Sequence, residues 1–301
     1  MTRPSAPPPM SFFAGGGREA GPCAVCIDLA GLTMALEGLD EALAARLLER
    51  YVPYASAEGA PRAALRVSFS RDDRDYFITP PEIPEVNPVL LACDADRVRY
   101  LGYRLAGWFD VREGRGQIVL SRGTFEPDLR SIENYVRAAI AWQAALQGGA
   151  LVHAASAVLK EQGYLFYGPS GAGKSTLSAC NTRARVVSDD LSLVLPRREG
   201  GLDLVGSPFR GTYTAGPPVV GRFPLATGFR IVKAPLAEVL AVPRVRAFAE
   251  LVANLPFLVD MLPEKPELFE RFERTFASLP LYHLRFCKDD SYWDAIDRAG
   301  L

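Results

Sequence analysis

Short apolar runs dominate the first 128 residues of the chain, and helical spacing occurs there only once. "LRVSFS", "PVLLACD", "RVRYLGY" and "GQIVLS" are rich in β-branched or aromatic residues and broken by Asp, Gly and Pro, which predicts an antiparallel meander. "AVCIDLAGLTMAL" predicts one or two further strands, and "DEALAARLLERYV" predicts a helix that begins near Asp40. We expect a β-rich domain over residues 21–128, preceded by a flexible Pro- and Gly-rich tail over residues 1–20.

A long helix is predicted after this domain, over residues 129–149. Ile132, Val136, Ile140 and Ala144 lie four residues apart, and Gly148 and Gly149 provide a stop. The following segment predicts a hairpin, "ALVHAASAVL" and "YLFY", that leads into a glycine-rich loop and a short helix. Later runs ("RVVSDDLSLVLP", "LDLVGSPFRG", "AEVLAV", "LYHLRF") predict strands, and two amphipathic segments and "SYWDAID" predict helices. We therefore expect an α/β (α+β) fold with a mixed or antiparallel sheet over residues 150–301.

Composition excludes several classes of protein. Basic and acidic residues number 34 and 35 among 301, so no overall positive charge would attract nucleic acid or an anionic membrane. No apolar stretch reaches the roughly 20 residues of a membrane-spanning helix, and no secretory signal is recognisable at the start. The default expectation is a cytoplasmic protein without nucleic-acid or membrane partners, with homo-oligomerisation left open. The five cysteines do not form a disulfide framework, and "CAVC" lacks the second ligand pair of a structural zinc site.

The run "YGPSGAGKST" carries the clearest chemistry. It matches the Walker A pattern and lies between a predicted strand and a predicted helix. Backbone N–H groups of such a loop turn towards phosphate, the lysine reaches the terminal phosphates and the serine hydroxyl ligates Mg²⁺. The predicted phosphate-binding residues are Gly168, Ser170, Gly171, Ala172, Gly173, Lys174, Ser175 and Thr176.

Two carboxylates follow the loop at Asp189 and Asp190, fifteen residues after Lys174. This interval allows only a short helix and one tight return, so we expect both carboxylates beside the loop. On an extended backbone their side chains point in opposite directions, one towards Mg²⁺ and one towards a substrate hydroxyl, unless the chain turns there. A solvated strand end is the alternative. An acidic pair near a phosphate loop suits metal-assisted phosphoryl transfer.

Three further residues have two interpretations each. His153 lies on the strand before the loop and is either a site residue or a satisfied core histidine, and the same choice applies to His283. Arg210, between Pro208 and Gly211 on a predicted loop, either clamps transferring charge or is an ordinary exposed arginine.

These motifs together resemble a known family. "HAASAVLKEQGYLFYGPSGAGKSTL", "VVSDDLSLVL" and "GSPFRGT" are similar in order and spacing to the catalytic domain of HPr kinase/phosphorylase, which shares a nucleotide-binding core with phosphoenolpyruvate carboxykinase. The resemblance covers about residues 150–300 and leaves residues 1–130 without a match. It implies that Lys174 and Ser175 bind ATP phosphates and Mg²⁺ and that Asp189 is the general base on an acceptor serine. It also implies that Asp190 assists with the metal, that His153 lies near the phosphates and that Arg210 steadies the transferred group.

The function expected from the resemblance is an ATP- and Mg²⁺-dependent serine kinase acting on a peptide or protein, with a ribosomally made peptide precursor as one candidate acceptor. Thr176 replaces the Glu usual in HPr kinases, and their glycine-rich signature is missing after Arg210, so reverse activity and the acceptor's identity stay open. Two other hypotheses are a small-molecule kinase, for example of free serine, or carboxykinase-like transferase, and a nucleotide-binding regulator without turnover. The intact lysine, serine and aspartate set argues against a regulator, since binding alone needs no base.

Overall fold

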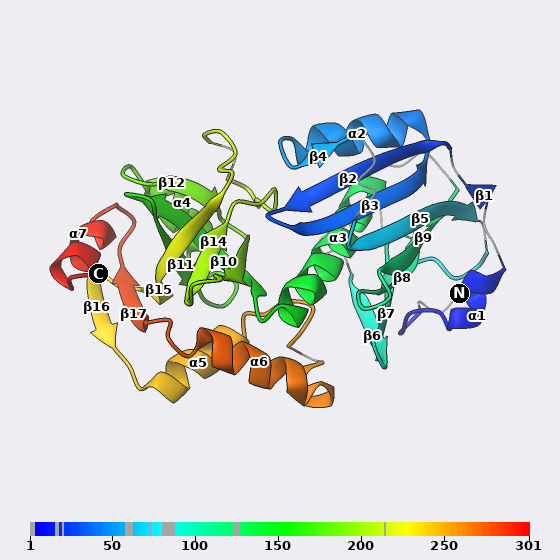
Figure 1. The fold of residues 1–301 in the computed structure, drawn as a ribbon. Coiled ribbons are helices and arrows are strands. Elements are labelled where there is room, and N and C mark those ends of the chain that lie inside the picture. Colours follow the sequence, from blue (N-terminus) through cyan, green and yellow to red (C-terminus); the bar gives the residue numbers. More distant parts are fainter. Residues whose placement is uncertain are drawn as a thin grey trace. The chain divides into compact units, whose positions relative to one another are not determined.

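The computed structural model describes residues 4–15, 18–19, 21–57, 63–72, 74–79, 88–122, 127–213, 215–259 and 261–301. It is a mixed α/β structure with many strands and few helices (Figure 1). The chain divides into two compact units, Met1–Ile140 and Ala141–Leu301. The predicted helix over 129–149 is α3, Pro127–Leu146, and the boundary between the units falls within it. Among the described residues, no helix is both long and apolar enough to cross a membrane.

The first unit is built around one large sheet. Its strands follow the order β4-β2-β3-β5-β9-β8-β7-β6, with β1 beside β5. The elements are α1 Met10–Ala14, β1 Arg18–Glu19, β2 Cys23–Leu29, β3 Leu32–Leu39, α2 Glu41–Tyr51, β4 Ala55–Ser56, β5 Leu65–Asp72, β6 Leu90–Asp94, β7 Arg97–Gly102, β8 Leu105–Asp110 and β9 Arg115–Ser121.

Local signals predicted the start of this unit well. The β2–β3 hairpin fills the predicted strand region, and α2 begins where expected because the Asp40 side chain caps it, accepting from the Leu43 N–H at 2.8 Å. The β6–β9 strands form the predicted antiparallel meander. The prediction is wrong for β5, which runs parallel to both β3 and β9. Helix α2 provides the crossover that returns the chain in the direction of β3.

Residues 4–15, part of the predicted flexible tail, pack against other residues of the first unit. Phe13 is buried in an apolar cluster with Ile78 and Leu101, and the Arg99 guanidinium donates to the carbonyls of Pro7 and Pro8 at 3.0 Å each. The apolar pair Phe12–Phe13 supplies the burial that holds a Pro-rich segment against the sheet. Of the predicted tail, residues 1–3, 16, 17 and 20 lie outside the described part.

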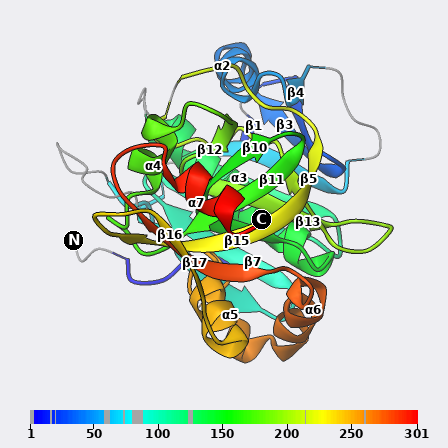
Figure 2. The ribbon, with the colours of Figure 1, turned by 90° about the vertical axis from the view of Figure 1, so that its left-hand side faces the viewer.

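The second unit contains the predicted phosphate-binding loop, residues 168–176, which we call the phosphate loop. Figure 2 shows its β15, β17 and β16 running side by side. Its elements after α3 are β10 Ala150–Leu159, β11 Gln162–Tyr167, α4 Lys174–Cys180, β12 Arg185–Ser188, β13 Leu191–Pro196, β14 Leu202–Val205, β15 Arg222–Lys233, β16 Glu238–Ala241, α5 Arg244–Val252, a 3₁₀ turn Leu262–Glu264, α6 Pro266–Phe276, β17 Leu281–Phe286 and α7 Tyr292–Arg298.

Strand β15 organises this unit. The strand path β11-β10-β13-β14-β15 closes on itself because β15 also pairs with β11, in parallel, while β17 and β16 extend the sheet beyond β15. The sheet is therefore mixed, as predicted. The sequence analysis did not predict β15, although it is twelve residues long. Its Pro224 and Gly228 interrupt the run of apolar residues on which that prediction depends.

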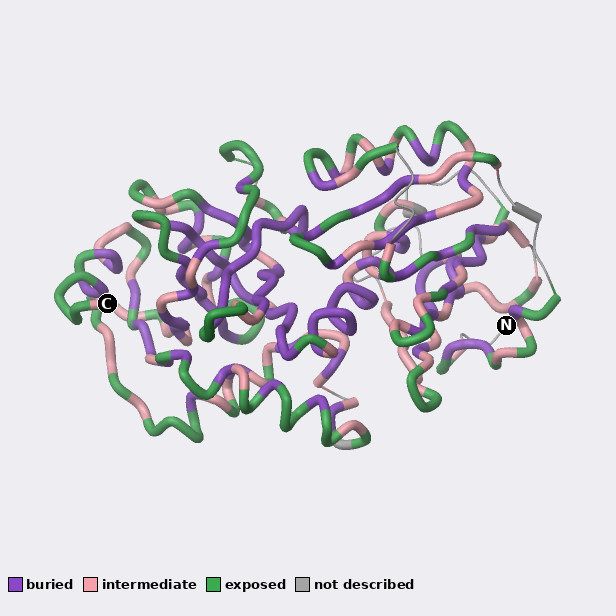
Figure 3. Tube along the Cα trace, in the orientation of Figure 1, coloured by how far each residue is buried: buried purple, intermediate pink, exposed green. Residues whose placement is uncertain are grey.

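An aromatic core lies directly beneath the phosphate loop. Phe166 of β11 and Phe229 of β15 stack with ring centroids 5.7 Å apart, and both belong to one buried cluster with Phe286 and Trp293. The indole N–H of Trp293 on α7 donates to Asn181 at the end of α4, at 3.0 Å. Figure 3 shows how the strands of this unit are buried over most of their length. The loop thus begins and ends on rigid elements.

Candidate functional site

The phosphate loop has the backbone that phosphate binding requires. Strand β11 ends at Tyr167 and α4 begins at Lys174, with positive φ angles at Gly168, Gly171 and Gly173 between them. Gly173 has φ of 110°, and an added Cβ would lie 2.7 Å from the Phe286 ring. Only glycine combines this conformation with such a close approach.

Lys174 is buried beneath the phosphate loop. Only 7% of the residue is exposed, and its ammonium donates to the carbonyls of Gly168 at 2.8 Å and Pro169 at 3.3 Å. Burial lowers the pKa of this lysine, and the negative charge of Asp190 acts in the opposite direction. A bound phosphate group would exchange bonds to these carbonyls for bonds to its own oxygens.

A pocket of about 460 Å³ opens beside the loop. It collects the loop residues, the acidic pair and His153, which the sequence analysis singled out separately. Of the predicted site residues, Gly168, Ala172 and Arg210 do not line it, whereas Gly211, Thr212 and Lys233 line it without having been predicted. The full lining is His153, Ser170, Gly171, Gly173, Lys174, Ser175, Thr176, Asp189, Asp190, Gly211, Thr212 and Lys233.

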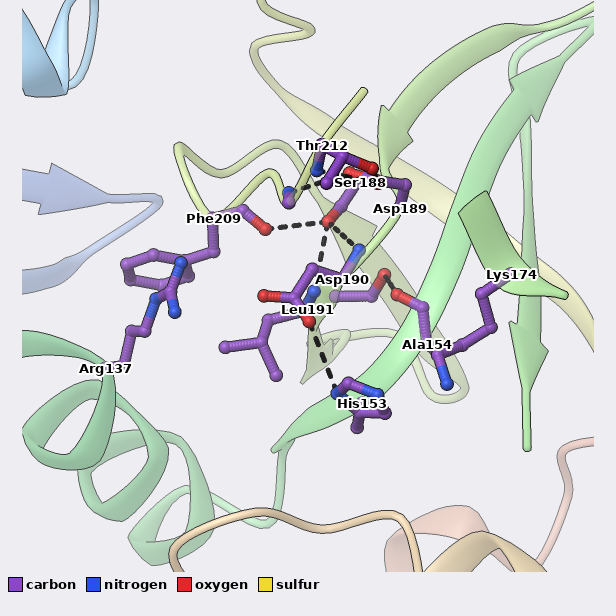
Figure 4. A network of polar contacts seen from close by, with 12 residues as sticks. Arg137, His153, Ala154, Lys174, Ser188, Asp189, Asp190, Leu191, Phe209 and Thr212 are labelled. Atoms are coloured by element: carbon purple, nitrogen blue, oxygen red, sulfur yellow. Dashed lines mark hydrogen bonds and ion pairs between the residues drawn. The ribbon is translucent and has the colours of Figure 1, made fainter. Parts of the chain in front are cut away.

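The acidic pair lies in a turn between β12 and β13. The Ser188 hydroxyl donates to the Phe209 carbonyl at 2.7 Å and accepts from the N–H groups of Asp190 and Leu191 at 3.1 Å each. This serine bends the chain where an extended strand would continue. The two carboxylates therefore enter different surroundings (Figure 4).

The Asp189 carboxylate is almost fully engaged by one segment. The residue is 2% exposed, and its oxygens accept from the N–H groups of Gly211 at 2.7 Å, Thr212 at 3.1 Å and Tyr213 at 3.1 Å. The Thr212 hydroxyl adds a longer bond at 3.3 Å. Four donors on one carboxylate leave little capacity for another partner.

The Asp190 carboxylate faces His153 instead. One of its oxygens lies 3.4 Å from the His153 Nδ1, and its charge acts on Lys174 (Figure 4). His153 stands on β10 opposite Leu191 and is partly open, with 37% of its side chain exposed. The two side chains thus lie together at the pocket, one on β10 and one on the turn that precedes its partner strand β13.

Arg210 has a different environment from the one that the resemblance implies. Its guanidinium donates to four main-chain carbonyls: Val186 at 3.4 Å, Val187 at 3.3 Å, Gly216 at 3.0 Å and Pro217 at 2.7 Å. These bonds tie the loop to β12. Arg210 itself does not line the pocket.

The second histidine belongs to another part of the unit. His283 on β17 is buried, and its Nε2 lies 2.6 Å from a Glu250 oxygen. Burial of Glu250 raises its pKa, but hydrogen bonds from His283 and Arg246 outweigh that effect and leave the pKa below its ordinary value. Within the described chain, His283 is thus a satisfied core histidine outside the pocket.

Lys233 and Thr212 are the pocket residues with side chains that sequence reasoning missed. Lys233 ends β15, and its Cε lies 3.7 Å from the position a Cβ would take on Gly173. Its ammonium has no ion pair or hydrogen bond within the described part of the chain. No local pattern marks either residue, because each reaches the pocket through non-local strand pairing or through bonds to Asp189.

The residues present are suited to a nucleotide phosphate with Mg²⁺. No group of three or more His, Cys, Asp or Glu side chains forms a metal site among the described residues. Mg²⁺ does not need one, since it is commonly held by one or two protein ligands together with phosphate oxygens. Ser175 and Asp190 both line the pocket and would supply these ligands.

No family model matches the chain, and no similar sequence is found among curated proteins.

Proposed function

We propose that this chain is an ATP-dependent kinase that transfers a γ-phosphoryl group to a serine hydroxyl of a peptide or protein. The observation that carries the proposal is one pocket lined by two chemically different sets of residues. Lys174 and Ser175 come from the phosphate loop, and Asp190 and Thr212 come from the acidic turn and from the segment after β14. Phosphoryl transfer needs this pairing of a phosphate cradle with acceptor-side polar groups.

We also propose that the second unit has a phosphoenolpyruvate carboxykinase-like kinase fold. A phosphate loop that follows a β-hairpin, with an acidic turn before the next strand, resembles the phosphoenolpyruvate carboxykinase-like kinase core. The order β10, β11, loop, α4, β12, acidic turn and β13 supports that resemblance.

Bound ATP would supply the γ-phosphoryl group, and Mg²⁺ would neutralise charge on its phosphate oxygens. The loop N–H groups and Lys174 would orient the phosphates, and Ser175 and Asp190 would hold the metal. The Asp190 carboxylate would take the hydrogen of the acceptor hydroxyl as the new O–P bond forms and the bond to the bridging oxygen breaks, which leaves ADP. Positioning and charge stabilisation account for the catalysis.

A polypeptide acceptor is favoured over a small molecule by the first unit. It has its own sheet, and β6 at the end of that sheet pairs only with β7 among the described residues. An open strand edge is a common means of binding an extended peptide. We propose that this domain captures the acceptor.

The test is a transfer assay with [γ-³²P]ATP. The full-length chain is incubated with a serine-containing peptide library and with proteins encoded by neighbouring genes, and the label is located by mass spectrometry. Label on serine in a polypeptide is expected, and the Lys174→Ala variant serves as control. Label only on added free serine would support the small-molecule alternative, and ATP binding without any transfer would support the regulator.

A further inference from the structure

One segment connects the two charged side chains that the resemblance made catalytic. Residues Phe209–Tyr213 form what we call the acceptor wall, because Gly211 and Thr212 line the same pocket as the phosphate loop. Asp189 holds its second half through three N–H groups and one hydroxyl. Arg210 holds the segment against β12 and against the carbonyls of Gly216 and Pro217.

The acceptor wall lies too close to the acidic turn to tolerate displacement. A Cβ added at Gly211 would lie 3.0 Å from the Asp190 Cβ and 3.1 Å from an Asp189 oxygen. The Phe209 carbonyl accepts from both the Ser188 hydroxyl and the Leu191 N–H. The turn and the wall are therefore packed and hydrogen-bonded along their whole length of contact.

The hydrogen-bond capacity of Asp189 is taken up by the acceptor wall. Asp189 is buried, and both of its oxygens already accept from the wall. Charge-assisted bonds of this kind fix geometry strongly and leave the carboxylate little room for a substrate hydroxyl. The Arg210 guanidinium likewise donates to four main-chain carbonyls, an arrangement that the single ammonium of a lysine cannot reproduce.

Resting on the kinase function proposed above, we propose that Asp189 and Arg210 are positioning residues. They hold the acceptor wall at the distance from the phosphate loop that an acceptor hydroxyl needs, and they do not touch the transferred group. Gly211 and Thr212 are the residues that contact the acceptor. The acceptor bound here is a serine hydroxyl presented between the wall and the loop.

The proposal separates three outcomes for Asp189→Asn. The asparagine NH₂ group would oppose the donors of Thr212 or Tyr213, so the wall loosens. If Asp189 is a positioning residue, the substitution raises the acceptor KM at least about ten-fold while kcat falls less than about three-fold. If Asp189 is the general base, the substitution lowers kcat by a factor on the order of 10²–10⁴ with little change in the acceptor KM. A purely structural role moves the melting temperature alone.

The experiment uses the full-length chain and two readouts. Hydrogen exchange of the Gly211, Thr212 and Tyr213 amides is measured in the unliganded protein, and acceptor kinetics are measured with the most strongly labelled peptide of the library. Asp189→Asn and Arg210→Lys are each expected to speed exchange at least about ten-fold. Asp203→Asn and Arg222→Lys are matched controls, because this ion pair lies outside the pocket. These controls should leave exchange in the wall as in the wild type.

Unchanged exchange in the acceptor wall, or a loss of kcat at constant acceptor KM, would overturn the proposal. If Asp189→Asn does not fold, Arg210→Lys carries the same test from the other end of the wall. Faster exchange without transfer to any peptide would support the positioning role and reject the kinase function, so the two failures are distinguishable.

Discussion

The phosphate loop and the acceptor wall face the same pocket but are built differently. The loop is one contiguous run, shaped by glycine backbone and supported from below by the ring of Phe286. The wall is held by two charged side chains, its own Arg210 and Asp189 on the turn after β12. Binding chemistry in the loop is therefore local in sequence, whereas the geometry of the wall is a tertiary property.

The largest expected effect is on the loop side. Lys174→Ala should lower kcat by on the order of 10³-fold and weaken ATP, because charge on the terminal phosphates is left uncompensated. Transfer from labelled ATP and fluorescence of N-methylanthraniloyl-ATP measure the two effects. Lys288→Ala, at an exposed lysine outside the pocket, is the control. Full activity in Lys174→Ala would remove the phosphate-loop interpretation.

Asp190→Asn tests the metal-binding role of the acidic turn, which lies between the phosphate loop and the acceptor wall in the proposed mechanism. We expect kcat to fall about 10²-fold and the Mg²⁺ concentration for half-maximal rate to rise, since one metal ligand loses its charge. Initial rates over a Mg²⁺ titration measure both. A fall in rate that excess Mg²⁺ leaves untouched, with an unchanged half-maximal concentration, would contradict the metal role.

Gly173→Ala probes the backbone rather than a side chain. Its left-handed φ and the nearby Phe286 ring should together weaken ATP by roughly ten-fold and lower the melting temperature. Gly200→Ala is a control with a left-handed φ of 92° and open space around the added Cβ. Equal ATP affinity in the two variants would show that the close approach to Phe286 is unimportant.

Lys233→Met should have a smaller effect on the same side. The pocket then loses its second cation, and the dissociation constant for N-methylanthraniloyl-ATP should rise about five-fold, mostly through weaker attraction of phosphate. Measurements at several salt concentrations check the cause, because an electrostatic contribution shrinks at high ionic strength. An effect that does not depend on salt would argue for packing instead.

Glu250→Gln concerns neither side of the pocket and should change stability alone. The pKa of Glu250 is depressed in the folded chain, so its stabilising contribution is complete above its ordinary value of 4.5 and is lost as pH falls through the folded value. The variant should melt below the wild type at neutral pH, and the difference should shrink in acid. Thermal denaturation over this range tests the sign, and a gap that widens in acid would contradict it.

Prediction from the sequence succeeded where the signal was local. The Asp40 cap, the β10–β11 hairpin and the phosphate loop are each specified by neighbouring residues. The parallel pairing of β5 and the existence of β15 were missed, because pairing partners lie far apart in the chain and Pro224 with Gly228 disguises β15.

The same limit to local signals explains which features of the candidate site the sequence predicted. Asp189 and Asp190 were identified as a pair, but their different environments depend on Ser188 and on a segment about twenty residues further along the chain. Lys233 was not predicted as a pocket residue for a similar reason, since it reaches the loop only through the pairing of β15 with β11. Side-chain roles that depend on such tertiary contacts leave no signal in the local sequence, so the residues alone could suggest the chemistry of the site but not its geometry.

Strand β15 also limits how this protein can change in length during evolution. Phe229 and Ile231 of β15 belong to the aromatic core, and Lys233, the next residue but one, lines the pocket at the strand's end. Inserting or deleting a single residue after Gly228 would exchange the two faces of everything that follows. Homologous sequences should therefore differ in residue type along β15 but keep its length. Insertions should collect instead at the exposed turn 197–201, where Gly200 and Gly201 adopt left-handed conformations with open space around them.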